Sequence, residues 1–574
     1  MNWNLKDLFE NEEMLDEETL SLDKKAEEFS KKYKDKLSTL KSDEFLDAIE
    51  KYEEILQGMG RILSYSFLKF ATDSKEGAFL AKYQEKCNKI DEKLLFFELE
   101  FNTLQEQNQD KLIFKCEKYS FYLEGLKKAK SHQLSQKEES LLLKQSMLGA
   151  SSYSRLFDEH FSTLKFKFDG EELSEEKILS LLHSPDRNTR KKAAKSLSEG
   201  LKPHQHLLGY IFNMIKKDLK IKCEIRNYES LEAPRHENNK ISQKSVDTLV
   251  EEAQKNFGLV HEYYDLKRKL LGFDKLYDYD RYAPLGTKEE IYSFDEAKKA
   301  TLKAFGEFSP QFRQIAQKAF DERWIDAYPA KDKRSGAFSH PGVPDAHPYV
   351  LLNYTDKRRD VFTLAHELGH ALHQYLSRDV GYISSDTPLT TAETASVFAE
   401  MLVFDSLKND LSDEEKIPLI AGKLEDIFAT LFRQINFTTY ERRVHAHEGE
   451  LSLDDFNSYW MVESEKMFGK SVELGEDYKI WWSYIPHFIH SSFYCYAYSY
   501  GQLLVLALYG LYKSKKMDNF VEVYTKFLSL GGSKSPKELV GMFDFDIDDG
   551  EFWQIGLNEV KNMLNEFKGL VDGR

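Results

Sequence analysis

The 574-residue sequence contains few prolines, glycines and cysteines: 13, 29 and four, respectively. Proline and glycine are typical of turns and loops, and cysteine pairs cross-link many secreted domains. So little proline and glycine argues against a loop-rich or all-β chain, whereas Lys, Glu and Leu recur throughout as helix formers. Cys87, Cys116, Cys223 and Cys495 have no paired spacing, which suits reduced thiols in a cytosol better than a disulfide framework. The sequence predicts a mostly helical, cytoplasmic protein.

Other absences narrow the class of partner. The chain has 80 Lys and Arg against 97 Asp and Glu, a formal charge of −17, so it lacks the basic excess that nucleic-acid binding needs. No apolar run approaches the roughly 18 residues of a membrane span. The N-terminus shows no basic patch followed by an apolar core, so we expect no signal peptide. We therefore expect no nucleic-acid and no membrane partner, whereas the oligomeric state is unknown from these features.

The first third of the chain is predicted to form charged amphipathic helices. Phe45, Ile49, Tyr52 and Leu56, for example, recur at helical spacing and are expected to face the core of a helical bundle. The sequence Ser-Pro-Asp at 184–186 then offers a cap and a fixed first turn to the next helix. We place a boundary near residue 190, between an N-terminal helical lobe, 1–190, and a catalytic domain, 191–574.

The strongest chemical signal is a pair of histidines on one predicted helix, His366 and His370, with Glu367 between them. Four residues on a helix place the two imidazoles about 6 Å apart along the axis and about 40° apart around it, so both can reach one ion. Glu367 lies about 100° around the helix from His366, close enough to touch water on that ion. Asp360 is expected to cap this helix. The pattern predicts a zinc site with a carboxylate base for attack on a carbonyl.

A catalytic zinc site usually has three protein ligands, and we favour Glu393 as the third. It follows His370 after enough chain for a loop and the start of a second helix. Glu400, two turns further on the same face, and Asp386 in the loop are alternatives, and Glu393 could instead close a capping box with Thr390. His373 is expected to orient a ligand or the substrate, because a catalytic zinc keeps one position for water.

A second cluster of histidines and tyrosines lies at residues 485–501. Imidazoles and phenols are the neutral donors that stabilise an oxyanion during peptide hydrolysis, although such a run could also be an aromatic core patch. Upstream, residues 335–339 and 349–354 are predicted to be short strands. A small sheet is therefore expected among the helices.

These motifs resemble oligoendopeptidase F, within the thimet-type oligopeptidase family of zinc metallopeptidases. The resemblance rests on residues 366–373, Glu393 within Ala-Glu-Thr-Ala-Ser, residues 348–354 and the run 485–498, and it covers about residues 180–560. It implies a mostly α, two-lobed, clam-like fold with a deep channel and a small β-sheet beside the zinc-site helix.

The resemblance also implies roles for individual residues. One Zn²⁺ per chain would be held by His366, His370 and Glu393, with Glu367 as the general base. His487 and Tyr498 would donate to the substrate carbonyl or oxyanion, and His490, Tyr494 or Tyr496 could be shifted into the same roles. Gly336, Ala337 and Phe338 would form an edge strand to which the substrate backbone adds.

The function predicted is a zinc-dependent endopeptidase that hydrolyses internal bonds of short unfolded oligopeptides. One alternative is a metallocarboxypeptidase that trims peptide C-termini with the same zinc motif. Another, from a different class, is a non-catalytic peptide-binding protein with structural zinc.

Overall fold

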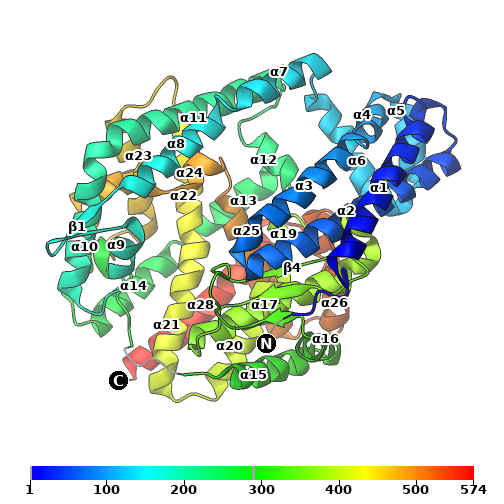
Figure 1. The fold of residues 1–574 in the computed structure, drawn as a ribbon. Helices are drawn as coiled ribbons and strands as arrows, with labels where there is room; N and C mark the ends of the chain where they lie inside the picture. The colour runs from blue at the N-terminus through cyan, green and yellow to red at the C-terminus, as the bar shows by residue number, and fades with distance from the viewer. Residues whose placement is uncertain (1–2, 287–290, 574) are drawn as a thin grey trace. The chain divides into compact units, whose positions relative to one another are not determined.

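The structure, a computed structural model, describes residues 3–286 and 291–573 and is built mostly of helices (Figure 1). It divides into two compact units that each draw on three stretches of the chain. The first unit comprises Met1–Ser131, Glu289–Asn409 and Met517–Asp544, and the second comprises His132–Lys288, Asp410–Lys516 and Phe545–Arg574. The boundary predicted near residue 190 falls within the second unit, inside the helix Arg187–Leu201, and stays a prediction about functional lobes.

The helices of the first unit come from all three of its stretches. They are α1 (Glu12–Tyr33), α2 (Ser42–Thr72), α3 (Gly77–Glu92), α4 (Phe96–Thr103), α5 (Glu106–Lys115), α6 (Ser120–Ala129), α15 (Phe294–Phe308), α16 (Pro310–Asp321), α17 (Arg358–Ser377), α18 (Tyr382–Ser385), α19 (Leu389–Ala392), α20 (Thr394–Asn409), α26 (Phe520–Ser529) and α27 (Pro536–Gly541).

The second unit is also helical, with one small hairpin. Its helices are α7 (Gln136–Ser146), α8 (Ala150–Thr163), α9 (Glu175–Leu181), α10 (Arg187–Leu201), α11 (Gln205–Ile225), α12 (Ala233–Asn238), α13 (Gln243–Lys255), α14 (Gly258–Leu270), α21 (Asp413–Thr430), α22 (Phe432–Ala446), α23 (Leu453–Phe468), α24 (His487–His490), α25 (Tyr496–Ser514) and α28 (Gly550–Asp572). β1 (Phe166–Phe168) and β2 (Glu171–Leu173) form the antiparallel hairpin.

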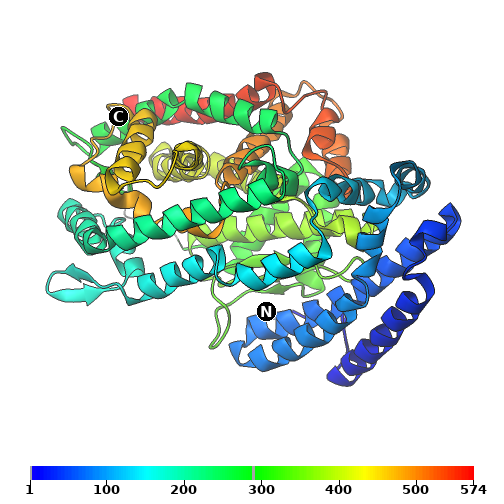
Figure 2. The same cartoon turned by 90° about the horizontal axis from the view of Figure 1, so that it is seen from above.

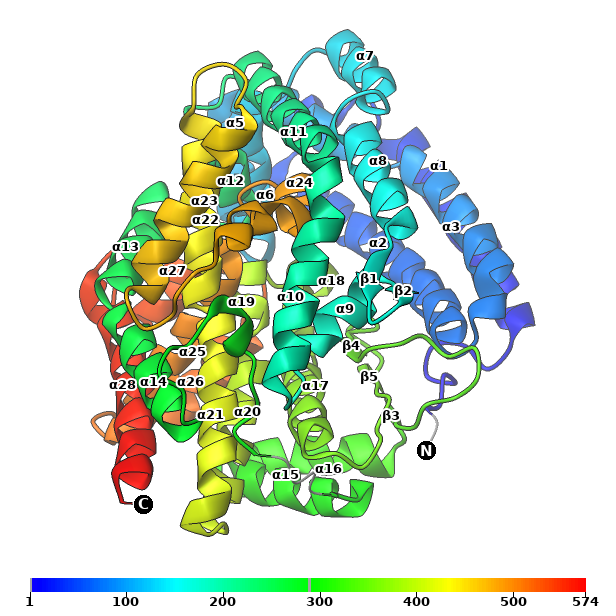
Figure 3. The ribbon, with the colours of Figure 1, turned by 90° about the vertical axis from the view of Figure 1, so that its left-hand side faces the viewer.

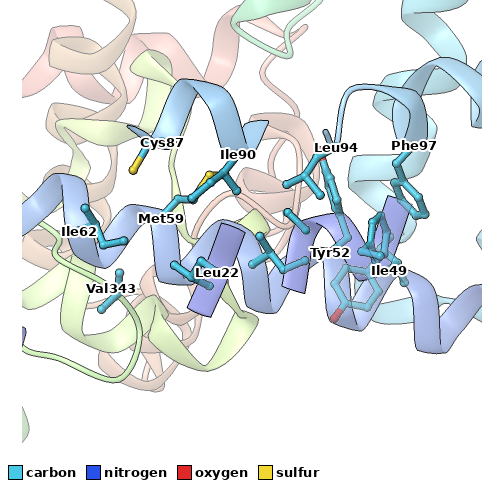
Figure 4. Close-up of a cluster of buried hydrophobic side chains, with 14 of the residues drawn as sticks. Leu22, Ile49, Tyr52, Met59, Ile62, Cys87, Ile90, Leu94, Phe97 and Val343 are labelled. Atoms are coloured by element: carbon cyan, nitrogen blue, oxygen red, sulfur yellow. The ribbon is translucent and has the colours of Figure 1, made fainter. Parts of the chain in front are cut away.

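The N-terminal helices α1, α2 and α3 pack side by side, as the blue ribbons of Figure 2 show. Three of the four residues of the predicted apolar stripe of α2 are buried, with Phe45 and Ile49 fully enclosed and Tyr52 5% exposed. The fourth, Leu56, is partly buried and packs against the same core. Figure 4 shows Ile49 and Tyr52 among side chains of this core. Helical spacing of apolar residues therefore placed the core face of this helix correctly.

A three-stranded sheet lies beside α17, as Figure 3 shows. Its strands are β3 (Ile325–Asp326), β5 (Tyr349–Leu351) and β4 (Phe338–His340), in that order; β3 is parallel and β4 antiparallel to β5. The prediction of a mostly helical fold with a small sheet beside the motif helix is confirmed.

The predicted bounds of the edge strand were wrong. Strand β4 begins at Phe338, so Gly336 and Ala337 precede it. Gly336 has a φ of +83°, a left-handed conformation that interrupts an extended strand and that glycine adopts without steric cost. Pairing with β5 then continues to His340, beyond the predicted end.

Helix α17 begins at Arg358, before the residue predicted to cap it. Asp360 lies within the first turn, where its carboxylate accepts hydrogen bonds from the backbone N–H groups of Thr355 at 2.7 Å and Lys357 at 3.2 Å. The prediction of Asp360 as the cap residue was wrong in position. The carboxylate nevertheless satisfies backbone donors at the helix start, because its side chain folds back toward the N-terminus.

Helices α17 and α20 lie very close to each other at Gly369. A Cβ atom at this position would lie 2.5 Å from the carbonyl oxygen of Ala395 and 2.6 Å from Cα of Ser396. Both neighbours are backbone atoms, which cannot rotate away as a side chain would. Glycine is therefore required for this spacing, which places the start of α20 against the histidines of α17.

Among residues 3–286 and 291–573, no helix is both long and apolar enough to span a bilayer.

We expect Gly369→Ala to lower the free energy of unfolding by about 1–3 kcal/mol, the usual cost of overpacking, and to weaken metal binding as α20 moves outward. Gly422→Ala is the matched control, because Gly422 also lies inside a helix but a Cβ there meets nothing within 4 Å. Denaturant unfolding and metal titration of both variants measure the effect. Equal stability and metal affinity in the two variants would contradict it.

Candidate metal centre

Three side chains meet on the first unit with one atom each directed to a common point. Helix α17 supplies His366 and His370, and Glu393 comes from the turn between α19 and α20. The two Nε2 atoms lie 3.2 Å apart, and Oε2 of Glu393 lies 3.3 Å from Nε2 of His366 and 3.4 Å from Nε2 of His370. The three atoms form a nearly equilateral triangle.

The size of this triangle fits a tetrahedral zinc site. Zinc–nitrogen and zinc–oxygen bonds of about 2.0–2.1 Å place tetrahedral ligand atoms about 3.3 Å apart, close to the three distances observed. Two imidazoles and one carboxylate are also the donor types of a catalytic zinc site, and three protein ligands leave a fourth position for water. Among the described residues, this is the group of His, Cys, Asp and Glu side chains found close enough to share an ion.

Side chains of α20 contact two of the three residues that form the triangle. Nδ1 of His366 lies 2.6 Å from Oε1 of Glu400, so the Nδ1 proton is directed to that carboxylate and Nε2 is left to bind a metal. The hydroxyl of Ser396 donates to Oε2 of Glu393 at 2.9 Å. Glu400, weighed as an alternative ligand, contacts His366 on the side away from the triangle, and Asp386 is not among the three residues that form the triangle.

Charges within this cluster compensate one another. Burial favours neutral forms, but hydrogen bonds to Glu393 and Glu400 outweigh it and raise the pKa of His366 to about 10. Burial likewise opposes ionisation of Glu393, yet hydrogen bonds from His366 and His370 lower its pKa well below the usual value. The cluster thus holds an ionised carboxylate, as a metal ligand must be.

Glu367 and His373 occupy the same helix with different surroundings from the ligands. Both are buried, at 6% and 4% exposure. Burial raises the pKa of Glu367 above its usual value, which makes it a better proton acceptor. Burial lowers the pKa of His373 to about 3, so that imidazole is neutral at pH 7. The raised basicity of Glu367 suits a general base.

These residues border a cavity of about 1230 Å³ on the first unit. Its wall includes helices α2 and α3, the turn around Asp386 and residues 337–342, which contain strand β4. Of the predicted substrate-binding segment, Ala337 and Phe338 border the cavity. The described lining contains four carboxylates and no lysine or arginine; the carboxylates are Glu98, Glu367, Asp386 and Glu393.

The predicted His/Tyr cluster lies in the second unit, in α24, at the start of α25 and in the turn between them. Helix α24 carries His487 and His490, and α25 begins at Tyr496. Nε2 of His487 lies 3.4 Å from the hydroxyl of Tyr498, and the rings of Tyr494 and Tyr498 meet edge to face with centroids 5.0 Å apart. The structure therefore brings His487, Tyr494 and Tyr498 together.

Two members of that cluster are engaged elsewhere. The hydroxyl of Tyr496 is buried and lies 2.8 Å from Nδ1 of His236 and 2.9 Å from Nδ2 of Asn239. Nε2 of His490 lies 2.9 Å from a carboxylate oxygen of Asp158. Tyr496 thus ties α25 to α12, and His490 pairs with α8.

A strained residue that sequence reasoning missed shapes this segment. Phe493, between α24 and α25, has a φ of +55°, which is unfavourable for a bulky side chain. Its backbone N–H donates to Oε1 of Glu441 at 2.8 Å, and burial raises the pKa of Glu441 to about 8. Single-sequence patterns carry no signal for such an outlier.

Comparison with known proteins extends over the whole chain. The model described as Peptidase family M3 matches residues 180–559, and that described as Oligopeptidase F matches residues 100–166. An oligoendopeptidase F homolog from Borreliella burgdorferi is 30% identical, and the match covers 99% of this chain and 97% of the relative's chain. Oligopeptidase PepF from Bacillus subtilis is 28% identical, with coverages of 99% and 87%.

Solved structures give the same fold. A protein from Chlamydophila abortus matches with a TM-score of 0.89 at 25% identity, covering 99% of this chain and 98% of that one. Oligoendopeptidase-F from Enterococcus faecium matches with a TM-score of 0.72 at 24% identity, and the match covers 98% of this chain and 100% of that one.

We expect Glu400→Ala to weaken zinc affinity by about 10- to 100-fold, the usual cost of losing a partner that orients a metal-binding histidine. Glu400→Gln is the matched control, because its amide oxygen can still accept from Nδ1 of His366. Competition against a chelator of known affinity measures both. If Glu400→Ala binds zinc as tightly as the unaltered chain, Glu400 does not orient the site.

Proposed function

The chain belongs to peptidase family M3, as the resemblance of its motifs predicted, and from this premise we propose a zinc-dependent oligoendopeptidase with Glu367 as its general base. That the chain is a metalloendopeptidase follows from the family and its relatives. The proposal adds the identity of the metal, the base and the groups that meet the substrate.

The observation that carries the proposal is the triangle formed by His366, His370 and Glu393. Its edges of 3.2–3.4 Å match those of a tetrahedral zinc site, and it borders a cavity large enough for several peptide residues. When bound there, zinc would supply a Lewis acid that acidifies water and polarises the carbonyl of the bond to be cut.

Glu367 performs the proton transfers in this proposal. Its carboxylate accepts a proton from the attacking water and returns it to the departing amine, so the peptide is cleaved and the enzyme is restored. Its burial favours this role, because a desolvated carboxylate holds a proton more strongly than one in water. The ligands His366, His370 and Glu393 keep their positions throughout.

We also propose that His487 and Tyr498 donate hydrogen bonds to the substrate carbonyl as negative charge develops on it. Burial and the positive charge of Arg433 lower the pKa of His487, so its imidazole is a neutral donor. The two side chains already face each other at 3.4 Å. Turnover unchanged in Tyr498→Phe would remove Tyr498 from this role.

The substrate in this proposal is an oligopeptide cut at an internal bond. Ala337 and Phe338 at the cavity wall would bind its main chain, with Gly336 shaping the turn before them, and Tyr494 would contact it beside Tyr498. His490 and Tyr496 are already hydrogen-bonded to other side chains. In this proposal they hold the segment in place. A carboxypeptidase would need a cation for the terminal carboxylate, and the described cavity lining holds neither lysine nor arginine.

A cytoplasmic location completes the proposal. Its support is that all four cysteines are buried and free, the state that a reducing compartment maintains.

We expect Glu367→Gln to bind zinc normally and to lose about 10²- to 10⁴-fold in turnover, the usual contribution of a general base. The amide fills the same volume but cannot accept the proton. Zinc content by mass spectrometry and peptide hydrolysis rates are measured on the same preparation. A zinc-loaded variant with near-normal turnover would refute the assignment of the base.

We expect the enzyme to cut an internally quenched peptide whose amino and carboxyl ends are both blocked. An endopeptidase needs neither terminus, whereas a carboxypeptidase needs the free carboxylate. Fluorescence release from the blocked peptide is compared with that from the same sequence with a free carboxyl end. Cleavage confined to the free form would favour the carboxypeptidase, and no cleavage of either by zinc-loaded protein would favour a non-catalytic binder.

A further inference from the structure

Strand β4 is an edge strand, and a side chain of α17 hydrogen-bonds to one of its residues. In the order β3, β5, β4, and among the residues that the structure describes, β4 is paired with another strand on one side only. Gln374 reaches this strand with two hydrogen bonds to Ser339: its Nε2 donates to the backbone carbonyl at 3.2 Å, and its Oε1 accepts from the hydroxyl at 2.7 Å.

The alternation of an antiparallel strand identifies which main-chain groups face outward. On the far side of β5, the N–H of Val350 donates to the carbonyl of Trp324 at 2.8 Å, so the main chain of Val350 is directed to β3. Ser339, its partner on β4, is therefore at a non-hydrogen-bonded position and directs its main-chain groups to the outward edge. Just before the strand, the carbonyl of Gly336 accepts from Nδ2 of Asn353 on the β5 side at 2.8 Å, which leaves the next carbonyl, that of Ala337, on the outward side. The hydrogen bond from Gln374 reaches the carbonyl of Ser339 from this outward side. Of the two carbonyls that face outward, those of Ala337 and Ser339, one is therefore already hydrogen-bonded.

Gln374 also lies one helical turn beyond His370, on the helix that carries the metal-binding triangle. Gln374, Ser339 and Ala337 border the same cavity as His366 and His370. A rigid helix therefore fixes the distance between the metal ligands and the point where the outward edge of β4 is closed.

We propose that Gln374 ends the peptide-binding edge of β4 at Ser339 and thereby sets which bond of the substrate is cut. A substrate strand that adds to this edge pairs with the main chain of Ala337, just before β4, and finds the next outward carbonyl, that of Ser339, already bonded to Nε2 of Gln374. Pairing at Ser339 in place of Ala337 would move the peptide by two residues, because outward groups recur every second residue. The inference rests on the proposed function, with peptide bound as an added strand.

The preference that one such hydrogen bond can impose is modest but measurable. A net main-chain hydrogen bond changes an equilibrium by about 2- to 10-fold. Removal of Gln374 is therefore expected to raise cleavage at the bond two residues from the main site by about that factor, relative to the main site. Turnover alone would not distinguish this role from a structural one, whereas the ratio of products does.

The test uses full-length zinc-loaded protein and a blocked ten-residue peptide, with products identified by mass spectrometry. Gln374→Leu removes both hydrogen bonds at similar volume, and Gln374→Glu removes only the donor to the carbonyl. Ser339→Ala is the matched control, because it loses the hydroxyl bond and keeps the carbonyl occupied. Zinc content and melting temperature are recorded for each variant.

We expect both Gln374 variants to increase the product from the bond two residues away, whereas Ser339→Ala keeps the wild-type ratio. If Gln374→Leu does not fold, Gln374→Glu decides the question. An unchanged ratio in a folded, zinc-loaded Gln374 variant would overturn the inference, as would a shift of equal size in Ser339→Ala. A wild-type enzyme that cuts no peptide would instead overturn the proposed function, so the two failures are distinct.

Discussion

The metal centre depends on the close approach of α17 and α20 at Gly369. A Cβ atom there would overlap backbone atoms of Ala395 and Ser396, so only glycine allows the two helices this spacing. Because of it, Glu393 at the start of α20 reaches both imidazoles, and Glu400 two turns later reaches the far side of His366. Main-chain packing in this way determines the geometry of the ligands.

One helix also carries several functions at fixed separations. Along α17, His366 and His370 supply two corners of the triangle proposed to bind zinc, Glu367 supplies the proposed base, and Gln374 contacts the edge strand β4. Sites built on a helix hold their groups more accurately than sites on loops. The same rigid helix thus positions the proposed metal site, the proposed base and the proposed end of the peptide-binding edge. A shift of α17 would move all three together.

Much of this site could be predicted from sequence because its residues lie on one helix or a short distance along the chain from it. The spacing of His366 and His370 on a helix fixes their relation, and the chain length before Glu393 allows a second helix to return. The choice of Glu393 over Glu400 as ligand stays a prediction that the triangle supports. The orienting bond of Glu400 depends on helix packing, which a single sequence does not reveal, although Gly369 within the motif was an unused signal.

Other features depended on tertiary contacts and were missed or misplaced. The edge strand begins after Gly336 and not at it, because the left-handed turn there comes from the backbone and not from residue type alone. Tyr496 looked like its neighbours in a tyrosine-rich run, yet its hydroxyl is buried against His236 and Asn239. The strained backbone of Phe493 left no pattern in the sequence.

X-ray absorption at the zinc K-edge, on protein loaded with one equivalent of zinc, measures directly which side chains bind the metal. We expect four nitrogen or oxygen ligands at about 2.0 Å, with the scattering signature of two imidazole rings and no sulfur. We also expect one imidazole to be lost in His370→Ala. A sulfur ligand, or an imidazole count in that variant equal to that of the unaltered protein, would show that His366, His370 and Glu393 do not form the zinc site.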